Sequence, residues 1–194
     1  MLFRSNLFMK KFLIAAALAS LALFSLAACG GKDASSAAEP KDYSQIIHDA
    51  RTDEENENLM ILTGKGDGSF TAADGPAGEM TEEDLKAQAD NFILPMLGLQ
   101  DGDYEEFSAS VSLLNVRSYG VAIVKPAEGK TEAVQEALEN YVTSQQMSME
   151  NYLADQYEIA KAATVTTVPT GEVVLVCCEN SADVLAAIEA ALAA

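Results

Sequence analysis

The chain changes character at a single residue, Cys29. The seventeen residues before it, 12–28, read FLIAAALASLALFSLAA and carry only apolar or small side chains. The residues after it, 30–42, read GGKDASSAAEPKD and are small, polar and rich in Gly, Ser and Ala, a composition typical of a flexible tether. The sequence therefore predicts that only residues 43–194 can bury a core, which is enough chain for one domain of ordinary size.

The segment before Cys29 has the layout of an export signal. Arg4, Lys10 and Lys11 form a basic stretch without acids, and the apolar run follows it directly. Seventeen residues lie at the short limit for a membrane-spanning helix, so a signal anchor is the alternative. We predict a signal peptide over 1–28, whether translation starts at Met1 or at Met9.

The end of that segment, SLAACGG, resembles a bacterial lipobox, with Leu26, Ala27 and Ala28 before Cys29. This resemblance implies cleavage before Cys29 and a diacylglyceryl group on its thiol. Each buried CH₂ contributes about 0.8 kcal/mol, so a lipidated cysteine anchors a protein firmly when it carries two chains or more. We expect a lipidated Cys29 with a flexible tether over 29–42, and a location on the outer, extracytoplasmic face of the cell membrane.

The charge of the remaining chain narrows its partners. From Cys29 onward there are nine basic and 30 acidic residues, a formal charge of −21. Such a surface repels nucleic acids and anionic lipid headgroups, so we expect no nucleic-acid partner. It favours an envelope protein or a cationic ligand, although a solvated acidic surface that only keeps the protein soluble explains the charge as well.

Secondary structure is predicted first for residues 43–98. We expect a helix over 43–51 with Ser44 as N-cap, then a strand over 59–62 that runs into a Gly-rich loop over 63–80. A second helix opens at Thr81 and ends at Pro95 and Gly98. Its apolar face comprises Leu85, Ala89, Phe92, Ile93 and Met96.

The second half of the chain predicts strands paired with helices. Apolar residues alternate over 107–113, as in a half-buried strand, whereas 119–125 is continuously apolar, as in a strand covered on both sides. A helical stretch over 130–163 breaks near Ser148. A hairpin turning at 169–171 and a last helix capped by Asn180 follow.

These elements predict an α+β fold: a two-layer sandwich with a mainly antiparallel sheet of four or five strands and helices on one face. The segments that begin at Gly120 and Gly171 echo one another, each a strand, a short polar turn and a helix. This echo is compatible with two ββα units, or with the general likeness of any two strand–helix pairs.

No catalytic arrangement is visible in the sequence, and we predict neither an enzyme nor a cofactor or metal. The only histidine, His48, is expected to be an exposed helix residue, and neither a GxSxG elbow nor a phosphate-binding glycine loop occurs. A calcium loop over 63–74 would place Lys65 at a ligand position, where a lysine cannot coordinate a cation. A Gly-rich turn explains that segment better.

Two adjacent cysteines, Cys177 and Cys178, lie in a predicted strand, so their side chains point to opposite faces. There is no CxxC motif, and adjacent cysteines without histidines make a poor zinc site. We expect both to be structural thiols, because a free cysteine is usually a buried apolar residue.

One helix, with the sequence YLADQYEIAKAA, carries the only binding residues that we predict: Asp155, Tyr157 and Glu158. The acids fall toward the solvated side of this helix. The alternative is an ordinary helix whose tyrosine contacts the core.

Residues 54–194 resemble the family named domain of unknown function 4358. The resemblance rests on the paired strands ASVSLLNVRSYGVAIVKPAEGK, the helix ending in YLADQYEIA, and the GEVVLV strand before a terminal helix. Members are small lipoproteins, chiefly of clostridia and related Gram-positive bacteria, without an established activity. The resemblance implies a surface location and a non-enzymatic role.

The leading hypothesis is a lipid-anchored, extracytoplasmic binding or interaction module. A cell-envelope hydrolase with an unrecognised carboxylate or metal site, and an assembly factor for an envelope machine, are the alternatives.

Overall fold

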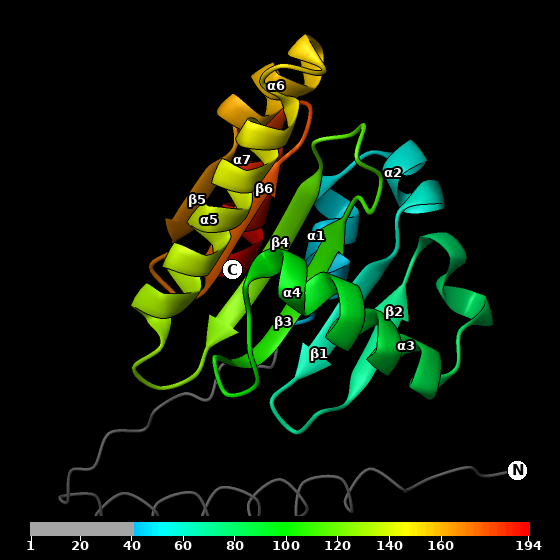
Figure 1. The fold of residues 1–194 in the computed structure, drawn as a ribbon. Coiled ribbons are helices and arrows are strands. Elements are labelled where there is room, and N and C mark those ends of the chain that lie inside the picture. Colours follow the sequence, from blue (N-terminus) through cyan, green and yellow to red (C-terminus); the bar gives the residue numbers. More distant parts are fainter. Residues whose placement is uncertain (1–40) are drawn as a thin grey trace, which may run out of the picture. The chain divides into compact units, whose positions relative to one another are not determined.

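A computed structural model describes residues 41–194, which form one compact unit around a six-stranded antiparallel sheet. The predicted signal peptide, Cys29 and the tether up to residue 40 lie outside the described residues. The strand order is β2-β1-β3-β4-β6-β5 (Figure 1). The strands are β1 Ile61–Lys65, β2 Phe70–Ala73, β3 Tyr104–Val111, β4 Gly120–Pro126, β5 Thr164–Thr167 and β6 Val173–Cys177.

Seven α-helices, a 3₁₀ segment and a π segment accompany the sheet in the described part of the chain. They are α1 Tyr43–Ala50, α2 Asp53–Asn58, η1 Gly75–Glu79, α3 Glu82–Gln88, η2 Ala89–Ile93, α4 Leu94–Leu97, α5 Thr131–Met149, α6 Ala154–Lys161 and α7 Ser181–Ala193. None of the helices over residues 41–194 is both long and apolar enough to span a membrane. The predicted α+β class and antiparallel sheet are confirmed.

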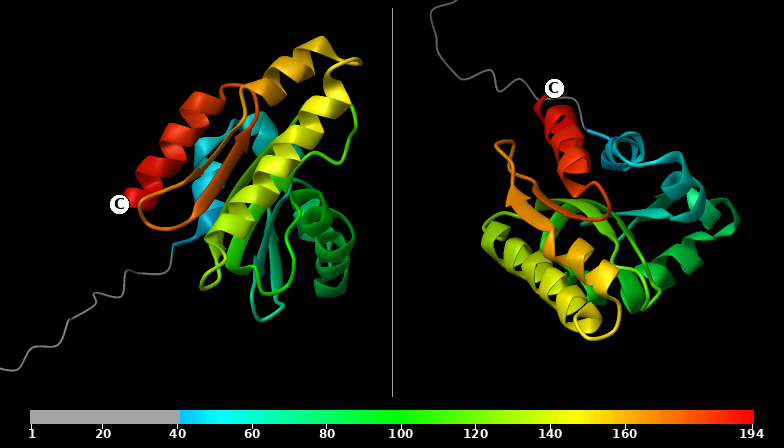
Figure 2. Two further views of the ribbon diagram at one scale, coloured as in Figure 1. Left: turned by 60° about the vertical axis from the view of Figure 1, so that its left-hand side comes forward. Right: turned by 90° about the horizontal axis from the view of Figure 1, so that it is seen from above.

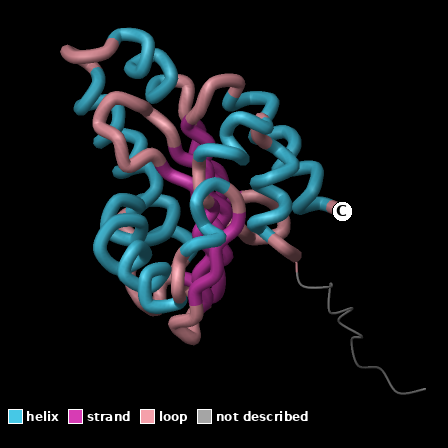
Figure 3. The backbone as a smooth tube through the Cα atoms, turned by 90° about the vertical axis from the view of Figure 1, so that its right-hand side faces the viewer, coloured by secondary structure: helices cyan, strands magenta, loops and turns pink. Residues whose placement is uncertain are grey.

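The prediction that helices cover one face is wrong, because they cover both. One core cluster joins Leu138 of α5 to Leu175 of β6, and a second joins Ile188 of α7 to Val174 of the same strand. Seen edge-on, the sheet lies between two layers of helices (Figure 3). Strands β4 and β6 are buried along almost their whole length, as strands covered on both faces must be.

Strand β3 is also covered on both faces, contrary to the predicted half-buried strand. Ser108 and Ser110, which alternate with its apolar residues, are fully buried. Each hydroxyl has a polar partner: Ser108 Oγ lies 2.6 Å from Thr63 Oγ1, and Arg51 donates to Ser110 Oγ at 2.7 Å. Because these hydroxyls are buried and hydrogen-bonded, the strand has the same alternating sequence pattern as a strand with one face in solvent.

The strand count exceeds the predicted four or five because the expected loop over 63–80 contains a hairpin. Strand β2 pairs with β1 from Gly64 with Phe70 to Ile61 with Ala73. A β-carbon on Gly64 would lie 2.4 Å from the ring of Phe107, so only glycine fits beneath that ring.

The order of two ββα units is present, β3-β4-α5 and β5-β6-α7, but their helices lie on opposite faces of the sheet. Figure 2, seen from above, separates α7 and α1 from α5 across the strands. A two-fold axis perpendicular to the sheet would leave both helices on one face. The geometry therefore contradicts a simple duplication.

The predicted helix over 43–51 is confirmed as α1, and a second helix that was not predicted, α2, follows it. Helix α1 is capped by Asp42, not by Ser44: the Asp42 carboxylate accepts from the Gln45 backbone N–H at 3.1 Å. Helix α2 begins after Thr52, which forms a reciprocal capping box with Glu55. The spacing of that threonine and glutamate is a recognisable start signal that the prediction overlooked.

The helical stretch after Thr81 continues through Pro95 by means of the π segment, in which the Leu94 N–H bonds to Ala89 O. The extra residue accommodates a proline that cannot donate. Gly98, at φ 70°, ends the stretch as predicted. Phe92, assigned to the apolar face, is instead 50% exposed.

The break between α5 and α6, the hairpin turn at 169–171 and the position of Asn180 before α7 are confirmed. Asn180 is left-handed, at φ 56°, and its side chain makes no capping hydrogen bond. Asparagine suits this position before α7 because it tolerates the left-handed backbone conformation.

Candidate functional site

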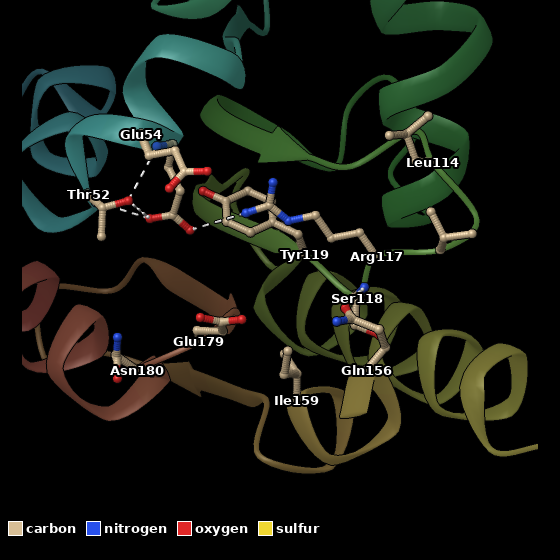
Figure 4. Close-up of a pocket in the computed structure, with 12 residues that line it drawn as sticks. Thr52, Glu54, Leu114, Arg117, Ser118, Tyr119, Gln156, Ile159, Glu179 and Asn180 are labelled. Atoms are coloured by element: carbon tan, nitrogen blue, oxygen red, sulfur yellow. Dashed lines mark hydrogen bonds and ion pairs between the residues drawn. The ribbon is translucent and has the colours of Figure 1, made fainter. Parts of the chain in front are cut away.

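A cleft of about 590 Å³ opens at the end of the sheet where β6 stops and β4 begins (Figure 4). Helix α2, the β3–β4 loop, helix α6 and the start of α7 contribute its walls. Its lining residues are Thr52, Glu54, Glu55, Leu114, Val116, Arg117, Ser118, Tyr119, Gln156, Ile159, Glu179 and Asn180. Its volume lies within the range of small-ligand sites.

The wall formed by α2 owes its shape to the capping box. The Glu55 side chain accepts from the N–H of Thr52 at 3.0 Å and from its hydroxyl at 2.9 Å, which holds this carboxylate at the helix start. Arg117 Nη2 lies 3.8 Å from Glu55 Oε1, and its guanidinium carbon lies 4.9 Å from the centre of the Tyr119 ring. Glu55 and the ring thereby fix the one cationic group of the cleft.

Tyr119 connects the cleft to the interior. Burial raises the pKa of its phenol to about 12, against the effect of the nearby Arg51 guanidinium. The Arg51 side chain is fully buried, donates to the Tyr119 hydroxyl at 3.3 Å, and bonds Asp74 Oδ2 at 2.9 Å. This pair holds the floor of the cleft rigid.

Ser118, at the start of β4, is 2% exposed. Its backbone N–H donates to Gln156 Oε1 at 2.9 Å, which fastens the β3–β4 loop to α6. Its hydroxyl oxygen is buried and has no hydrogen-bond partner among the described residues. A buried hydroxyl without a partner is costly, so a polar group brought by a ligand would satisfy it.

The charge of the cleft is negative. Three carboxylates, those of Glu54, Glu55 and Glu179, face one guanidinium. Within residues 41–194, the side chains of Glu54 and Glu179 take part in no hydrogen bond or ion pair, so both remain available to a cation. Leu114 and Val116 give the same cleft an apolar rim.

The cleft lies opposite the place where the described chain begins. Tyr43, at the start of α1, donates to Glu172, which directly precedes β6, whereas Glu179 of the cleft directly follows that strand. Lys41 bonds the carbonyl of Leu192 near the end of α7. Figure 2 shows the start of α1 and the C-terminus together at that end.

The predicted binding residues Asp155, Tyr157 and Glu158 all lie on α6, but none of them lines the cleft. Their helix neighbours Gln156 and Ile159 do. Asp155 and Glu158 are exposed, as predicted; Glu158 pairs with Lys161 at 3.0 Å, and the same ammonium lies over the Tyr157 ring. Helix α6 therefore lines the cleft with residues other than the predicted ones.

The cysteine prediction is confirmed in its geometry. Cys177 belongs to the core on one face of the sheet and Cys178 to the core on the other. Burial raises the pKa of each thiol to about 12. Neither is a reactive nucleophile at ordinary pH.

His48 lies on α1 with its side chain 42% exposed, as predicted, and it also has a carboxylate partner that was not predicted. Its Nδ1 lies 2.8 Å from Asp74 Oδ2. A carboxylate that orients a histidine is half of an acid–base arrangement. No hydrogen bond of the described residues joins the other ring nitrogen, Nε2, to a hydroxyl or thiol, so the second half is lacking there.

Comparison with known families identifies the chain. The family described as Domain of unknown function (DUF4358) matches residues 78–178, more than half of the sequence. The chain belongs to this family. No curated protein and no solved structure matches it.

Among residues 41–194, no group of three or more His, Cys, Asp or Glu side chains is placed to hold a metal ion.

Proposed function

We propose that this protein is a lipid-anchored, extracytoplasmic binding module, held at the membrane by Cys29, whose acidic cleft receives a cationic group of an envelope partner. The observation that carries the proposal is the cleft itself, in which the side chains of Glu54 and Glu179 have no hydrogen-bond or ion-pair partner among the described residues.

Electrostatics support a cation as the ligand. From Cys29 onward the chain has a formal net charge of −21. The cleft is negative as well, because it contains three carboxylates and one guanidinium. A concave site lined by one sign of charge concentrates ligands of the opposite sign and accelerates their association. Because Arg117 is paired with Glu55, an incoming ammonium or guanidinium would meet Glu54 and Glu179 first.

The position of the cleft supports a partner in the extracytoplasmic space. An anchor at Cys29 would join the domain through Lys41, at the end opposite the cleft. The cleft would then be free to face away from the lipid. An apolar rim at this far end suits contact with a protein better than contact with an anionic bilayer.

The anchor is tested on the native N-terminus. Mass spectrometry of the protein from the membrane fraction should find residues 1–28 removed and a diacylglyceryl group on Cys29. A Cys29→Ser variant should leave the membrane fraction. An unprocessed N-terminus, or a cysteine without lipid, would overturn the anchored location.

The cleft is tested in living cells by photocrosslinking. A photoreactive amino acid at Val116, on the rim, should capture a partner, whereas one at Glu136, exposed on α5 and outside the cleft, should not. The adduct should disappear when Glu54→Gln and Glu179→Gln are combined. Equal capture at both positions, or an adduct unaffected by the charge change, would refute a cleft-directed interaction.

The alternative, a cell-envelope hydrolase, has one observation in its favour, the Asp74–His48 pair. The captured partner distinguishes the two functions. A binding module leaves it intact during incubation with purified protein, whereas a hydrolase produces fragments of defined mass that are lost in His48→Asn.

A further inference from the structure

The β3–β4 loop, residues 112–119, has an unusual tip for a protein surface. Leu113, Leu114 and Val116 are exposed in it, Leu114 by 66%. The two other hairpin turns of the described chain are polar: 66–69 reads GDGS and 169–171 reads PTG. Apolar side chains gathered at one tip indicate a contact surface, since scattered exposure alone would not concentrate them there.

Further apolar groups lie at the same end of the molecule. Of the six large apolar side chains that are exposed among residues 41–194, Met147 and Tyr152 come from the corner between α5 and α6. Figure 1 places this corner and the β3–β4 loop at one end of the sheet. Five of the six therefore lie at that end, which makes it a contact surface rather than a random scatter.

A second cavity, of about 260 Å³, lies on the other side of the loop. Its lining is mostly apolar and includes Leu59, Met60, Ile93, Val111 and Leu113. Gln88 also lines it, and the Oε1 of this amide is buried without a hydrogen-bond partner in the described structure. The cavity thus offers an apolar space with one unused acceptor.

The two cavities adjoin, because Leu114 and Arg117 line both of them. The loop that separates them is ordered by its own hydrogen bonds: the Leu114 N–H donates to Ser112 Oγ at 3.2 Å and the Arg117 N–H to Leu114 O at 3.3 Å. Figure 4 shows Leu114 and Arg117 on this loop. A ligand that crosses the loop can therefore occupy an acidic and an apolar site at once.

Resting on the proposed binding function, we propose that the occupant is an extended segment of a partner protein that lays an apolar side chain in the smaller cavity and a lysine or arginine in the acidic cleft. The acidic cleft alone does not distinguish a basic protein from any small amine. The apolar cavity adds that distinction, because a free amine leaves it empty.

The test is an unbiased selection on the full-length chain in nanodiscs of neutral lipid. A library of random displayed peptides is bound to it and counter-selected on empty nanodiscs. We expect enriched peptides with a basic and an apolar residue at fixed spacing. Enrichment of basic residues alone would overturn the two-cavity proposal and leave the proposed function standing. Enrichment of acidic or purely apolar peptides, or none at all, would overturn both.

Variants then locate the two contacts. Leu113→Ser should weaken the binding of a selected peptide by about tenfold, because it removes the contact with the apolar residue of the peptide. The same variant should not change the affinity for a peptide whose apolar residue has been replaced by Ser. Glu54→Gln with Glu179→Gln should weaken binding through the basic residue only. Glu136→Gln with Glu189→Gln removes the same charge from exposed helix positions outside both cavities and should leave the affinity unchanged. Equal losses in both charge pairs would show general attraction and refute the proposal.

Discussion

Arg51 is the most informative residue for stability, because its buried guanidinium joins four segments beneath the cleft. Its side chain is 0% exposed. It bonds Asn56 Oδ1 at 2.6 Å, Leu59 O at 2.6 Å, Ser110 Oγ at 2.7 Å, Asp74 Oδ2 at 2.9 Å and Tyr119 Oη at 3.3 Å. The change that tests this network is Arg51→Met, which keeps an apolar stem and removes every donor.

The expected cost follows from the partners left behind. Removing one member of a buried ion pair costs about 3–5 kcal/mol. Asp74 is 14% exposed and keeps His48, so the lower part of that range applies to its carboxylate. The Leu59 carbonyl and the Ser110 hydroxyl lose a donor as well, at about 1 kcal/mol each where no water replaces it. We expect a loss of about 3–5 kcal/mol in total, with the upper value where no water replaces the lost donor.

Asp74 makes the network more sensitive. Its backbone lies at φ 61° and ψ 174°, a strained conformation for a residue other than glycine. Its ion pair with Arg51 helps to hold that conformation. In Arg51→Met the Asp74 carboxylate keeps only His48 as a partner. Adding Asp74→Asn replaces this carboxylate by a neutral amide and should recover about 1 kcal/mol.

Urea unfolding followed by circular dichroism measures the free energy directly, and the expected fall in melting temperature is roughly 6–20 °C for a domain of this size. Arg117→Met is the matched control, because that arginine is 43% exposed and its ion pair with Glu55 is long, at 3.8 Å. It should cost less than about 1 kcal/mol. Similar losses in both variants, or a loss below about 1 kcal/mol in Arg51→Met, would refute the assignment of Arg51 as the buried anchor.

Three further outcomes are expected. Gly120→Ala should destabilise the fold by about 2–4 kcal/mol in urea unfolding, since its β-carbon would lie 2.6 Å from the Tyr141 hydroxyl. Cys177 and Cys178 should resist maleimide in the native protein and react once it is unfolded, as read by peptide mass spectrometry, because burial raises both pKa values to about 12. The pKa of Tyr119 is raised from 10.0 to about 12, so stability should be complete below pH 10 and fall as the pH rises from there toward 12, measured by urea unfolding across that interval.

The sequence predicted the elements whose signal is local. The break after α5, the turn at 169–171 and the stop at Gly98 each depend on a few neighbouring residues, and each was found. Helix α2 was not predicted, although the capping box at its start is also a signal made by neighbouring residues. That signal was present in the sequence and was overlooked. The missing β2 is different, because the glycines of that hairpin resemble a loop until the rings of Phe70 and Phe107 are seen to pack over Gly64.

The second helical layer could not be predicted from the polarity of single strands. In the sequence, Ser108 and Ser110 look like residues that face solvent. Their hydrogen bonds with Thr63 and Arg51, which only the tertiary structure shows, offset the free-energy cost of burying the two hydroxyls. The continuous apolar character of 119–125 did predict a strand covered on both sides. That indication was correct, and it should have led to the prediction that helices cover both faces of the sheet.

The cleft was beyond the sequence because its residues come from four separated segments, and none of them forms a motif by itself. The predicted α6 residues are adjacent to the ones that line the cleft, since a helix presents Gln156 and Ile159 to a different side from Asp155 and Glu158. The apolar tip of the β3–β4 loop was visible as Leu113, Leu114 and Val116. Leu113 was assigned to the predicted strand over 107–113, although β3 ends at Val111, and residues 114–118 were given no role.

Family membership constrains the two halves of this surface differently. The matched segment, residues 78–178, contains the β3–β4 loop, Arg117 and most of the lining of the apolar cavity. The carboxylates of the cleft, those of Glu54, Glu55 and Glu179, all lie outside it. The family match therefore includes the loop that we propose as a partner contact but not the acids that we propose to select a cation. The charge of a ligand must then be inferred for each family member from the segments that flank the matched region. In this chain those segments supply the three cleft carboxylates and favour a basic partner.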